Sequence, residues 1–397
     1  MKARARLKYV MISLLLIFAM LPVTQALASD TEDSEATGAV DLGFSVDARG
    51  AILIEAETGT VLFEQNQDAA YPPASVTKIM TLLLVMEALE SGKIALTDRI
   101  SVSEYAASMG GSQVFLEEGE AMTVEEMIKC TVIASANDAA VALAEYVSGS
   151  EGAFVAEMNR RAEELGMTST HFENVTGLDD TTENHVTSAS DIAKMSRELI
   201  KHDLILKYSS VWMDSIRDGA FTLTNTNRLI RYYEGATGLK TGSTEKAKFC
   251  ISACATRGGM TLIAVIMGAP TRDARNEAAR RLLDYGFSNY ALYRFEGRRW
   301  SDVPVLGGSE PYIEAELAGF SAVVKKSELS GVVFDLSLPE KIEAPVCVGD
   351  EIGSAVFRTG ETHLATMPIR ALTPSPKMNY WQVFLKLLQR VIFSHEF

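Results

Sequence analysis

The spacing of apolar residues along the chain predicts segments of several kinds. Around residues 51–64, two short apolar runs flank a turn that contains glycine, which is typical of a β-hairpin. Residues 75–206 follow helical spacing instead, and three features predict helix ends. Thr123 and Glu126 are spaced as a capping box, Ser150 is placed to cap a following helix, and Gly166 is expected to end that helix.

Strand-like runs return in the next part of the chain, at residues 238–244, 248–256 and 260–267. A helical pattern over residues 272–285 follows, and we expect Gly286 to end that helix. Strands, then a block of helices, then strands and a last helix indicate an α+β domain. We expect the first and last strands to pair in one antiparallel sheet, with the helical subdomain inserted between them, over residues 44–294.

The pattern changes once more towards the C-terminus. Residues 295–372 carry short alternating runs, which predict a small all-β domain. Residues 373–397 are expected to form a proline-containing linker and an amphipathic helix. One face of this helix gathers large apolar side chains and the other face gathers polar ones: Trp381, Phe384, Leu385, Leu388 and Ile392 against Lys386, Gln389 and Arg390. The helix is suited to a membrane surface, and the alternative is a helix docked on its own β-domain.

The N-terminus has the features of a signal peptide. Residues 1–28 begin with basic residues and continue with an apolar stretch that is shorter than a typical membrane-spanning helix. They end in a small-x-small cleavage signal. The alternative is an uncleaved anchor. Residues 29–43 are acidic, small and polar, as in a disordered spacer. We therefore expect an exported protein.

Composition narrows the possible functions further. The formal net charge of −15 argues against nucleic acid as a partner, because phosphate binding needs a basic surface. The five histidines are scattered without a metal-binding motif, so we expect no metal and no cofactor. The cysteines match no zinc pattern, and we expect all four to be buried apolar residues: Cys130, Cys250, Cys254 and Cys347.

A Ser-x-x-Lys motif begins the helical block. Ser75 precedes a segment that is apolar on every side, so Lys78 is expected one turn into a buried helix. Residues three apart share a helix face, which brings the lysine amine towards the serine hydroxyl. Burial and the positive helix N-terminus both lower the pKa of the Lys78 amine. A neutral amine could then take the serine proton as a general base.

Two further motifs, each taken alone, are weaker evidence for a catalytic site. Ser135 and Asn137 fall on a turn between two helices, where Ser135 could pass a proton to a leaving amine and Asn137 could bind Lys78 and a substrate amide. The alternative is simple helix capping. Lys240, Thr241, Gly242 and Ser243 lie on a glycine-edged strand. The lysine and threonine suit a substrate carboxylate, the glycine allows close approach, and the backbone N–H groups of Ser243 and Ser75 could form an oxyanion hole.

Together, these three motifs and their flanking residues resemble the low-molecular-mass penicillin-binding proteins, specifically the serine D-alanyl-D-alanine carboxypeptidases. The resemblance implies an acyl-enzyme on Ser75, release of the terminal D-alanine from a peptidoglycan pentapeptide stem, and covalent binding of β-lactam antibiotics. It also implies a β-rich C-terminal domain and a terminal helix that attaches the exported enzyme to the outer leaflet of the cytoplasmic membrane. The segments 174–178 and 185–191 resemble structural landmarks of the same family.

Several alternatives remain open from the sequence. A class A β-lactamase shares the motifs but needs a carboxylate for deacylation, usually in a Glu-x-x-Leu-Asn context that this chain lacks. A DD-endopeptidase would use the same residues on cross-linked stems, and a non-catalytic cell-wall-binding homologue could keep the fold. A second anchor for the substrate carboxylate also stays unassigned, with Arg228 and Arg231 nearby in sequence.

Overall fold

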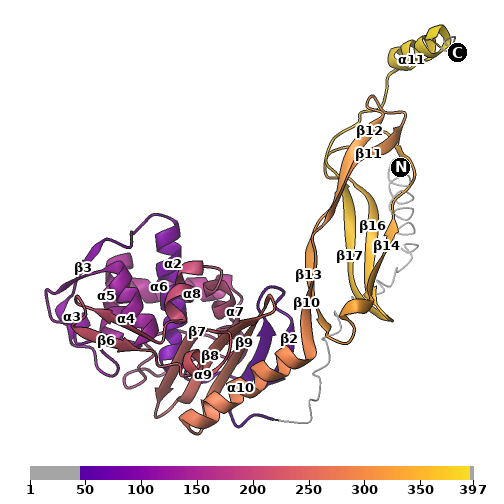
Figure 1. Cartoon of the computed structure of the whole chain (residues 1–397). Coiled ribbons are helices and arrows are strands. Elements are labelled where there is room, and N and C mark those ends of the chain that lie inside the picture. The colour runs from indigo at the N-terminus through magenta and orange to yellow at the C-terminus, as the bar shows by residue number, and fades with distance from the viewer. Residues whose placement is uncertain (1–44, 394–397) are drawn as a thin grey trace, which may run out of the picture. The chain divides into compact units, whose positions relative to one another are not determined.

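The computed structural model describes residues 45–393. The predicted signal peptide and the predicted acidic spacer lie outside these residues. The first part of the described chain is built on a five-stranded antiparallel sheet with the strand order β2-β1-β9-β8-β7 (Figure 1). Its strands are β1 (Gly50–Glu55), β2 (Val61–Gln65), β7 (Ala236–Thr244), β8 (Lys248–Arg257) and β9 (Met260–Ala269). The expected pairing of the first strand with the last one is confirmed, because Leu53 of β1 lies opposite Ala264 of β9.

The helical block is inserted between β2 and β7, as the α+β pattern predicted. It starts with a 3₁₀ turn, η1, which is followed by seven α-helices, two short strands and a β-hairpin. A short helix after the hairpin leads into β7. The elements are η1 (Ala74–Thr77), α2 (Lys78–Glu90), β3 (Arg99–Ser101), α3 (Glu104–Ala107), β4 (Ala121–Thr123), α4 (Val124–Ile133), α5 (Asn137–Ser148), α6 (Glu151–Glu164), α7 (Ala189–Leu199), α8 (Asp203–Ser209), β5 (Met213–Ile216), β6 (Phe221–Thr224) and α9 (Leu229–Tyr232).

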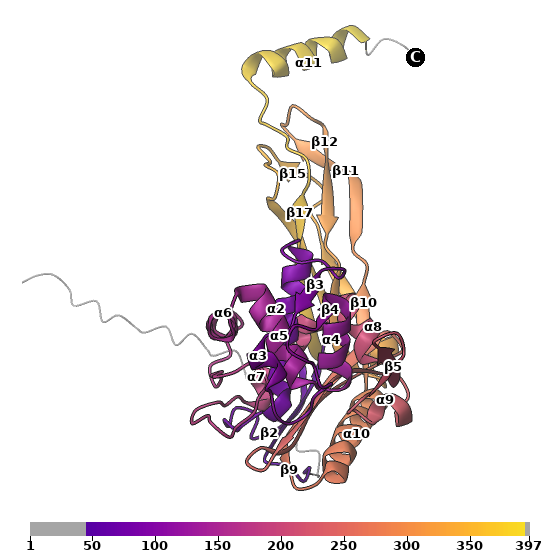
Figure 2. The ribbon, with the colours of Figure 1, turned by 90° about the vertical axis from the view of Figure 1, so that its left-hand side faces the viewer.

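The period of two along the strands places different apolar side chains on the two faces of the sheet. Ile52 and Ile54 of β1 pack into the core of the helical block, whereas Leu53 packs on the other face. That second face is covered by α10 (Arg272–Asn289), as Figure 2 also shows. Both faces of the central strands are therefore buried, which explains the nearly continuous apolar runs of β8 and β9.

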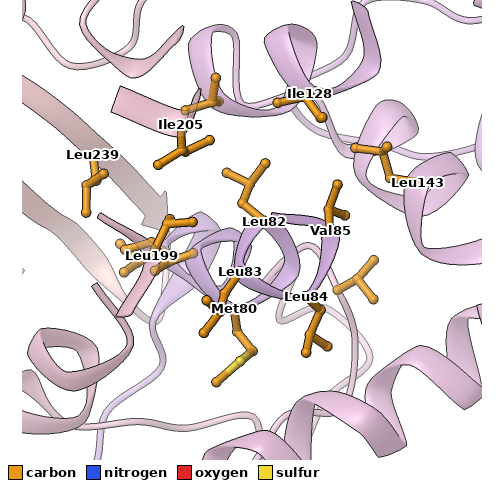
Figure 3. Packing of buried hydrophobic residues seen from close by; sticks show 14 of the residues in the cluster. Met80, Leu82, Leu83, Leu84, Val85, Ile128, Leu143, Leu199, Ile205 and Leu239 are labelled. Carbon is orange, nitrogen blue, oxygen red and sulfur yellow. The ribbon is translucent and has the colours of Figure 1, made fainter. Parts of the chain in front are cut away.

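Helix α2 runs through the middle of the larger core. Most of its side chains are buried, and Figure 3 shows Leu82, Leu83 and Val85 among apolar residues from four other helices and from β7. The neighbours labelled there are Ile128, Leu143, Leu199, Ile205 and Leu239. A helix that is apolar on all sides is stabilised only by such complete burial, so the first turn of α2 is fixed in position.

The predicted helix caps agree with the structure in all but one case. The capping box of Thr123 and Glu126 is formed at α4, and the Ser150 side chain accepts a hydrogen bond at the start of α6. The prediction for Gly286 is wrong, because α10 continues to Asn289. A Cβ at Gly286 would lie 2.5 Å from Leu262 Cδ1, so this glycine lets the helix lie close to the sheet rather than end.

The C-terminal part of the described chain is β-rich, as expected. It contains a two-stranded sheet, β10-β13, and a six-stranded sheet with the order β14-β16-β17-β12-β11-β15. Its core includes the stacked rings of Phe334 and Phe357. The elements are β10 (Tyr290–Phe295), β11 (Arg298–Leu306), β12 (Tyr312–Leu317), β13 (Phe320–Lys325), η2 (Leu329–Gly331), β14 (Val332–Ser337), β15 (Ile342–Glu343), β16 (Glu351–Thr359) and β17 (Thr362–Ala371).

The last segments differ from the prediction in two details. Residues 373–376, expected as a linker, are held against the β-rich part, because Ser375 is buried and exchanges backbone hydrogen bonds with Val346. Cys347 is exposed, which corrects its prediction as a buried residue, whereas the other three cysteines are buried. The terminal helix α11 (Tyr380–Phe393) is present, and its large apolar side chains are exposed. Within residues 45–393, no helix has the length and apolar content needed to cross a membrane.

A glycine next to the 3₁₀ turn gives a test of this packing. Gly177 has a φ of +81°, and a Cβ there would lie 1.8 Å from the carbonyl oxygen of Ala74. We expect Gly177→Ala to lower the free energy of unfolding by about 3 kcal/mol or more, from backbone strain and the clash together. Gly92→Ala is the control, because Gly92 also has a positive φ but nothing within 4 Å. Urea unfolding of both variants measures the difference, and equal losses would contradict the close contact.

Candidate functional site

The amine of Lys78 is enclosed by three hydrogen-bonding groups. Ser75 lies within the η1 turn and Lys78 is the first residue of α2, so the serine precedes the α-helix instead of opening it. Lys78 Nζ lies 3.0 Å from Ser75 Oγ, 2.5 Å from Asn137 Oδ1 and 2.8 Å from the carbonyl oxygen of Thr176. The lysine is 0 % exposed, whereas Ser75 is only partly buried. The hydroxyl therefore faces a cavity while the amine lies behind it.

Burial lowers the pKa of the Lys78 amine well below its usual value, and the charge of Lys240 lowers it further. The carboxylate of Asp138 acts in the opposite direction but with a smaller effect. These contributions favour an uncharged amine at Lys78.

The turn between α4 and α5 holds Ser135 and Asn137. Ser135 has a φ of +64° and is nearly buried, and its Oγ accepts a hydrogen bond of 2.7 Å from Lys240 Nζ. The Asn137 side chain also donates to the carbonyl oxygen of Gly110, at 2.7 Å. The second and third motifs are thus joined directly by Lys240, and the second and first by Asn137.

Asp138 was missed by the sequence reasoning. Its carboxylate is buried and accepts hydrogen bonds from the backbone N–H groups of Val114 and Leu116. It thereby fixes the loop between α3 and β4, which brings Ser112 to the edge of the cavity. The only sequence signal was an acidic residue directly after the Ser-x-Asn motif.

Strand β7 forms the opposite wall. A Cβ at Gly242 would lie 2.8 Å from the backbone nitrogen of Ser75, so only glycine allows the strand to lie this close to the η1 turn. Thr241 Oγ1 donates to Thr226 Oγ1 at 2.8 Å, and Ser243 is exposed to the cavity. Lys240 is buried, and burial together with the charge of Arg275 lowers its pKa to about 7.

The cavity between these walls has a volume of about 590 Å³. Its lining residues, among those that the structure describes, include three arginines and no acidic residue. They are Ser75, Ser112, Ser135, Trp212, Thr224, Asn225, Thr226, Arg228, Tyr232, Thr241, Gly242, Ser243, Arg272 and Arg275. The eight residues predicted from the three motifs are therefore brought together, with Lys78, Asn137 and Lys240 behind the surface that the other five help to form.

Arg275 was also missed, because the sequence indicated only Arg228 and Arg231 as arginines near the third motif. It is 3 % exposed yet lines the cavity, and its guanidinium lies 3.5 Å from the carbonyl oxygen of Cys250, which is the residue opposite Gly242 in the sheet. Burial lowers the pKa of Arg275 to about 10, which leaves it charged at neutral pH. Arg231 lies outside the lining and stacks on Trp212 instead. The only sequence signal for Arg275 was its position one turn into the helix that follows β9.

The two segments that resemble structural landmarks of the family, 174–178 and 185–191, lie next to Lys78 and Thr77 and form hydrogen bonds with them. The Asn174 side chain accepts hydrogen bonds from the backbone of Thr176 and Gly177, which shapes the loop that presents the Thr176 carbonyl to Lys78. His185 Nδ1 accepts from the backbone N–H of Glu173, so its Nε2 carries the proton and donates to Thr77 Oγ1. Burial lowers the pKa of His185 to about 4, so this histidine is neutral and structural.

Known proteins resemble this chain along most of its length. The family model described as D-alanyl-D-alanine carboxypeptidase matches residues 34–271. The D-alanyl-D-alanine carboxypeptidase DacF of Bacillus subtilis is 42 % identical over 93 % of this chain and 95 % of its own length. The enzyme DacC of Escherichia coli is 34 % identical, over 82 % of this chain and 83 % of its own length.

Solved structures agree with these relatives. Penicillin-binding protein 5 of Haemophilus influenzae superimposes with a TM-score of 0.75 at 29 % identity, over 84 % of this chain and 99 % of that protein. Penicillin-binding protein D2 of Listeria monocytogenes, solved in an ampicillin-bound form, has a TM-score of 0.57 at 30 % identity and covers 62 % of this chain and 98 % of its own. The chain therefore belongs to the peptidase S11 family of D-alanyl-D-alanine carboxypeptidases, and it is a hydrolase of that family.

Proposed function

We propose that this chain removes the terminal D-alanine from peptidoglycan pentapeptide stems through an acyl-enzyme on Ser75. The observation that carries the proposal is the position of the Lys78 amine. Two of its three neighbours, Asn137 Oδ1 and the Thr176 carbonyl, can only accept hydrogen bonds. A neutral amine has two hydrogens for these two acceptors, and its lone pair is then left to accept the proton of the Ser75 hydroxyl.

In the first step, Lys78 takes the Ser75 proton while Oγ attacks the carbonyl carbon of the penultimate D-alanine. The carbonyl oxygen becomes an oxyanion, which the backbone N–H groups of Ser75 and Ser243 would bind. The C–N bond then breaks, and the leaving amine receives a proton through Ser135. Lys240 lies 2.7 Å from Ser135 Oγ and orients this hydroxyl. Water hydrolyses the ester in the second half of the reaction, and the serine regains its proton.

The substrate's terminal carboxylate would lie against β7. Thr241 lines the cavity, and its hydroxyl hydrogen, which is donated to Thr226 Oγ1 in the free site, can turn towards a bound carboxylate. The charges of Lys240 and Arg275 lie just beneath it. A bound carboxylate would stabilise the charged form of Lys240. Because a β-lactam also joins a reactive amide to a carboxylate, we propose that the same groups bind penicillin and that Ser75 opens the ring.

The alternatives fit the cavity less well. A class A β-lactamase needs a carboxylate to drive deacylation, and among the described residues no acidic side chain lines the cavity. This favours slow turnover of the penicilloyl-enzyme. A non-catalytic homologue would have no use for a buried lysine beside a partly buried serine, because burying an amine costs stability.

Replacing the nucleophile is the first test. We expect Ser75→Ala to abolish covalent labelling by fluorescent penicillin, because no other hydroxyl lies beside Lys78 Nζ in the part of the chain that is described. Gel fluorescence measures the label, and thermal unfolding checks that the variant is folded. A folded Ser75→Ala protein that still forms a stable adduct would disprove the assignment.

Replacing the base is the second test. Lys78→Arg places at this position a positive charge that cannot be lost near neutral pH, so acylation should slow by about 100-fold or more. Stopped-flow or quenched labelling at pH 7 gives the acylation rate. Near-normal acylation of this variant would mean that a group other than Lys78 takes the serine proton.

A substrate change tests the carboxylate contact. Amidating the terminal carboxylate of a D-alanyl-D-alanine peptide should lower the kcat/KM of the unmodified enzyme by about 100-fold, because charge-assisted hydrogen bonds are lost. The same amidation should lower the kcat/KM of the Arg275→Gln variant by only about tenfold, because one partner of the carboxylate is already missing in that variant. Equal losses in both proteins would place the carboxylate elsewhere.

We further propose that the exported enzyme attaches to the outer face of the cytoplasmic membrane through α11. The helix carries Trp381, Phe384 and Leu388 exposed, together with Lys386 and Arg390. Their exposure disfavours a helix docked on its own β-domain. Transfer of several such side chains into a lipid interface would give reversible binding, at roughly 1.5–3 kcal/mol for each side chain that is fully buried.

A truncated protein tests this attachment. The mature chain should sediment with anionic liposomes, whereas a chain that ends at Met378, before α11, should stay in the supernatant and keep its carboxypeptidase activity. Ending the chain there retains the Ser375 contacts of the β-rich part. If both proteins sediment to the same extent, α11 is not the attachment site.

A further inference from the structure

The active-site cavity carries more positive charge than one carboxylate requires. Lys240, Thr241 and Arg275 already supply two cations and a donor where the terminal carboxylate is proposed to bind. Arg228 and Arg272 add two more guanidiniums to the lining of the same cavity. This concentration of charge occurs in a chain whose formal net charge is −15.

Neither of these two arginines is neutralised by the protein. Over residues 45–393, the side chains of Arg228 and Arg272 form no hydrogen bond and no ion pair, and both residues are exposed. Asp273 follows Arg272 in sequence but is not part of the cavity lining. Many other arginines of this domain do have carboxylate partners: Arg161 with Glu87, Arg217 with Glu120, and Arg280 with Glu277. Arg228 and Arg272, in contrast, line the cavity without a carboxylate partner among the described residues.

The three guanidiniums are close enough to affect one another. The charges of Arg272 and Arg228 both lower the pKa of Arg275, which is the effect of like charges at short range. Arg272 precedes Arg275 by three residues in α10, so the two share a helix face, with Cβ atoms about 5–6 Å apart. The free N–H groups of the first turn of this 18-residue helix add positive potential at the same end. Repulsion of this kind is relieved by a bound anion.

We propose that Arg228 and Arg272 form a second carboxylate-binding position beside the one for the terminal carboxylate, so that, among leaving residues larger than alanine, the cleft favours one with an additional carboxylate. This proposal rests on the proposed function, because it assumes that the terminal carboxylate binds at Thr241 and Arg275. One helical turn separates the two positions, a spacing that suits the α- and side-chain carboxylates of a single dicarboxylic amino acid. The cavity volume of about 590 Å³ is in the range that holds ligands far larger than one alanine.

The test compares three blocked peptides with the same acyl part. They end in D-alanyl-D-alanine, D-alanyl-D-glutamate and D-alanyl-D-glutamine, and the last two differ by one charge at nearly constant shape. We measure kcat/KM from release of the D-amino acid, or the competitive inhibition constant against the alanine peptide where cleavage is too slow. The unmodified enzyme should prefer glutamate over glutamine by about tenfold. Because both arginines are exposed, the preference should fall as salt rises from about 0.05 to 0.5 M.

Variants assign the preference to these residues. Arg228→Gln and Arg272→Gln should each reduce the glutamate-to-glutamine ratio to about threefold, and the double variant to about one. Arg160→Gln is the matched control, since Arg160 is an exposed arginine of α6 outside the cavity, and it should keep the ratio of the unmodified enzyme. Penicillin labelling counts the folded active sites in each preparation.

The outcomes separate this inference from the proposed function. A ratio near one in the unmodified enzyme, or a ratio that survives in the double variant, overturns the second carboxylate position while leaving the hydrolysis of the alanine peptide intact. If the unmodified enzyme neither cleaves the alanine peptide nor reacts with penicillin, the proposed function fails first, and this inference fails with it.

Discussion

The catalytic domain depends on one physical constraint, which is the removal of the Lys78 amine from water. An isolated ammonium group in a protein interior is strongly destabilised, so the amine must either find acceptors or lose its proton. Here, Asn137 and the Thr176 carbonyl supply two acceptors, and Ser75 supplies a hydroxyl. The neighbouring segments are shaped to bring these groups to one point.

Each neighbouring segment reaches that point through a specific backbone feature. The all-apolar helix α2 buries the lysine, and Gly242 lets β7 lie against the η1 turn. Gly177 lets the loop with Thr176 pass beside Ala74, and Asp138 holds the loop that carries Ser112. The contacts that stabilise the fold are therefore the same contacts that position the groups around Ser75. Besides burial, the charge of Lys240 lowers the pKa of Lys78 and so helps to keep its amine neutral. Lys240 is itself buried behind Ser135.

The sequence predicted the parts of this arrangement that local patterns encode. The unbroken apolar run after Ser75 indicated a buried helix, and the order of strands and helices indicated the sheet in which β1 pairs with β9. Contacts between distant segments could not be predicted in the same way. Arg275 lines the same cavity as Thr241 only because α10 follows β9 across the sheet. The Thr176 carbonyl is a backbone group, so no residue type in the sequence marks it. Gly286 was misjudged because glycine serves both helix ends and close packing, and only the Leu262 contact separates the two.

The proposed mechanism depends most directly on the protonation state of Lys78, which can be measured. Heteronuclear NMR of the protein with isotope-labelled lysine reports the charge of each amine, and the Lys78→Arg variant assigns the signal by its loss. We expect an uncharged Lys78 amine at pH 7, in a protein whose Lys240 signal titrates separately. A Lys78 amine that is fully protonated at pH 7 in the free, folded enzyme would contradict the account, because it could not accept the proton of Ser75.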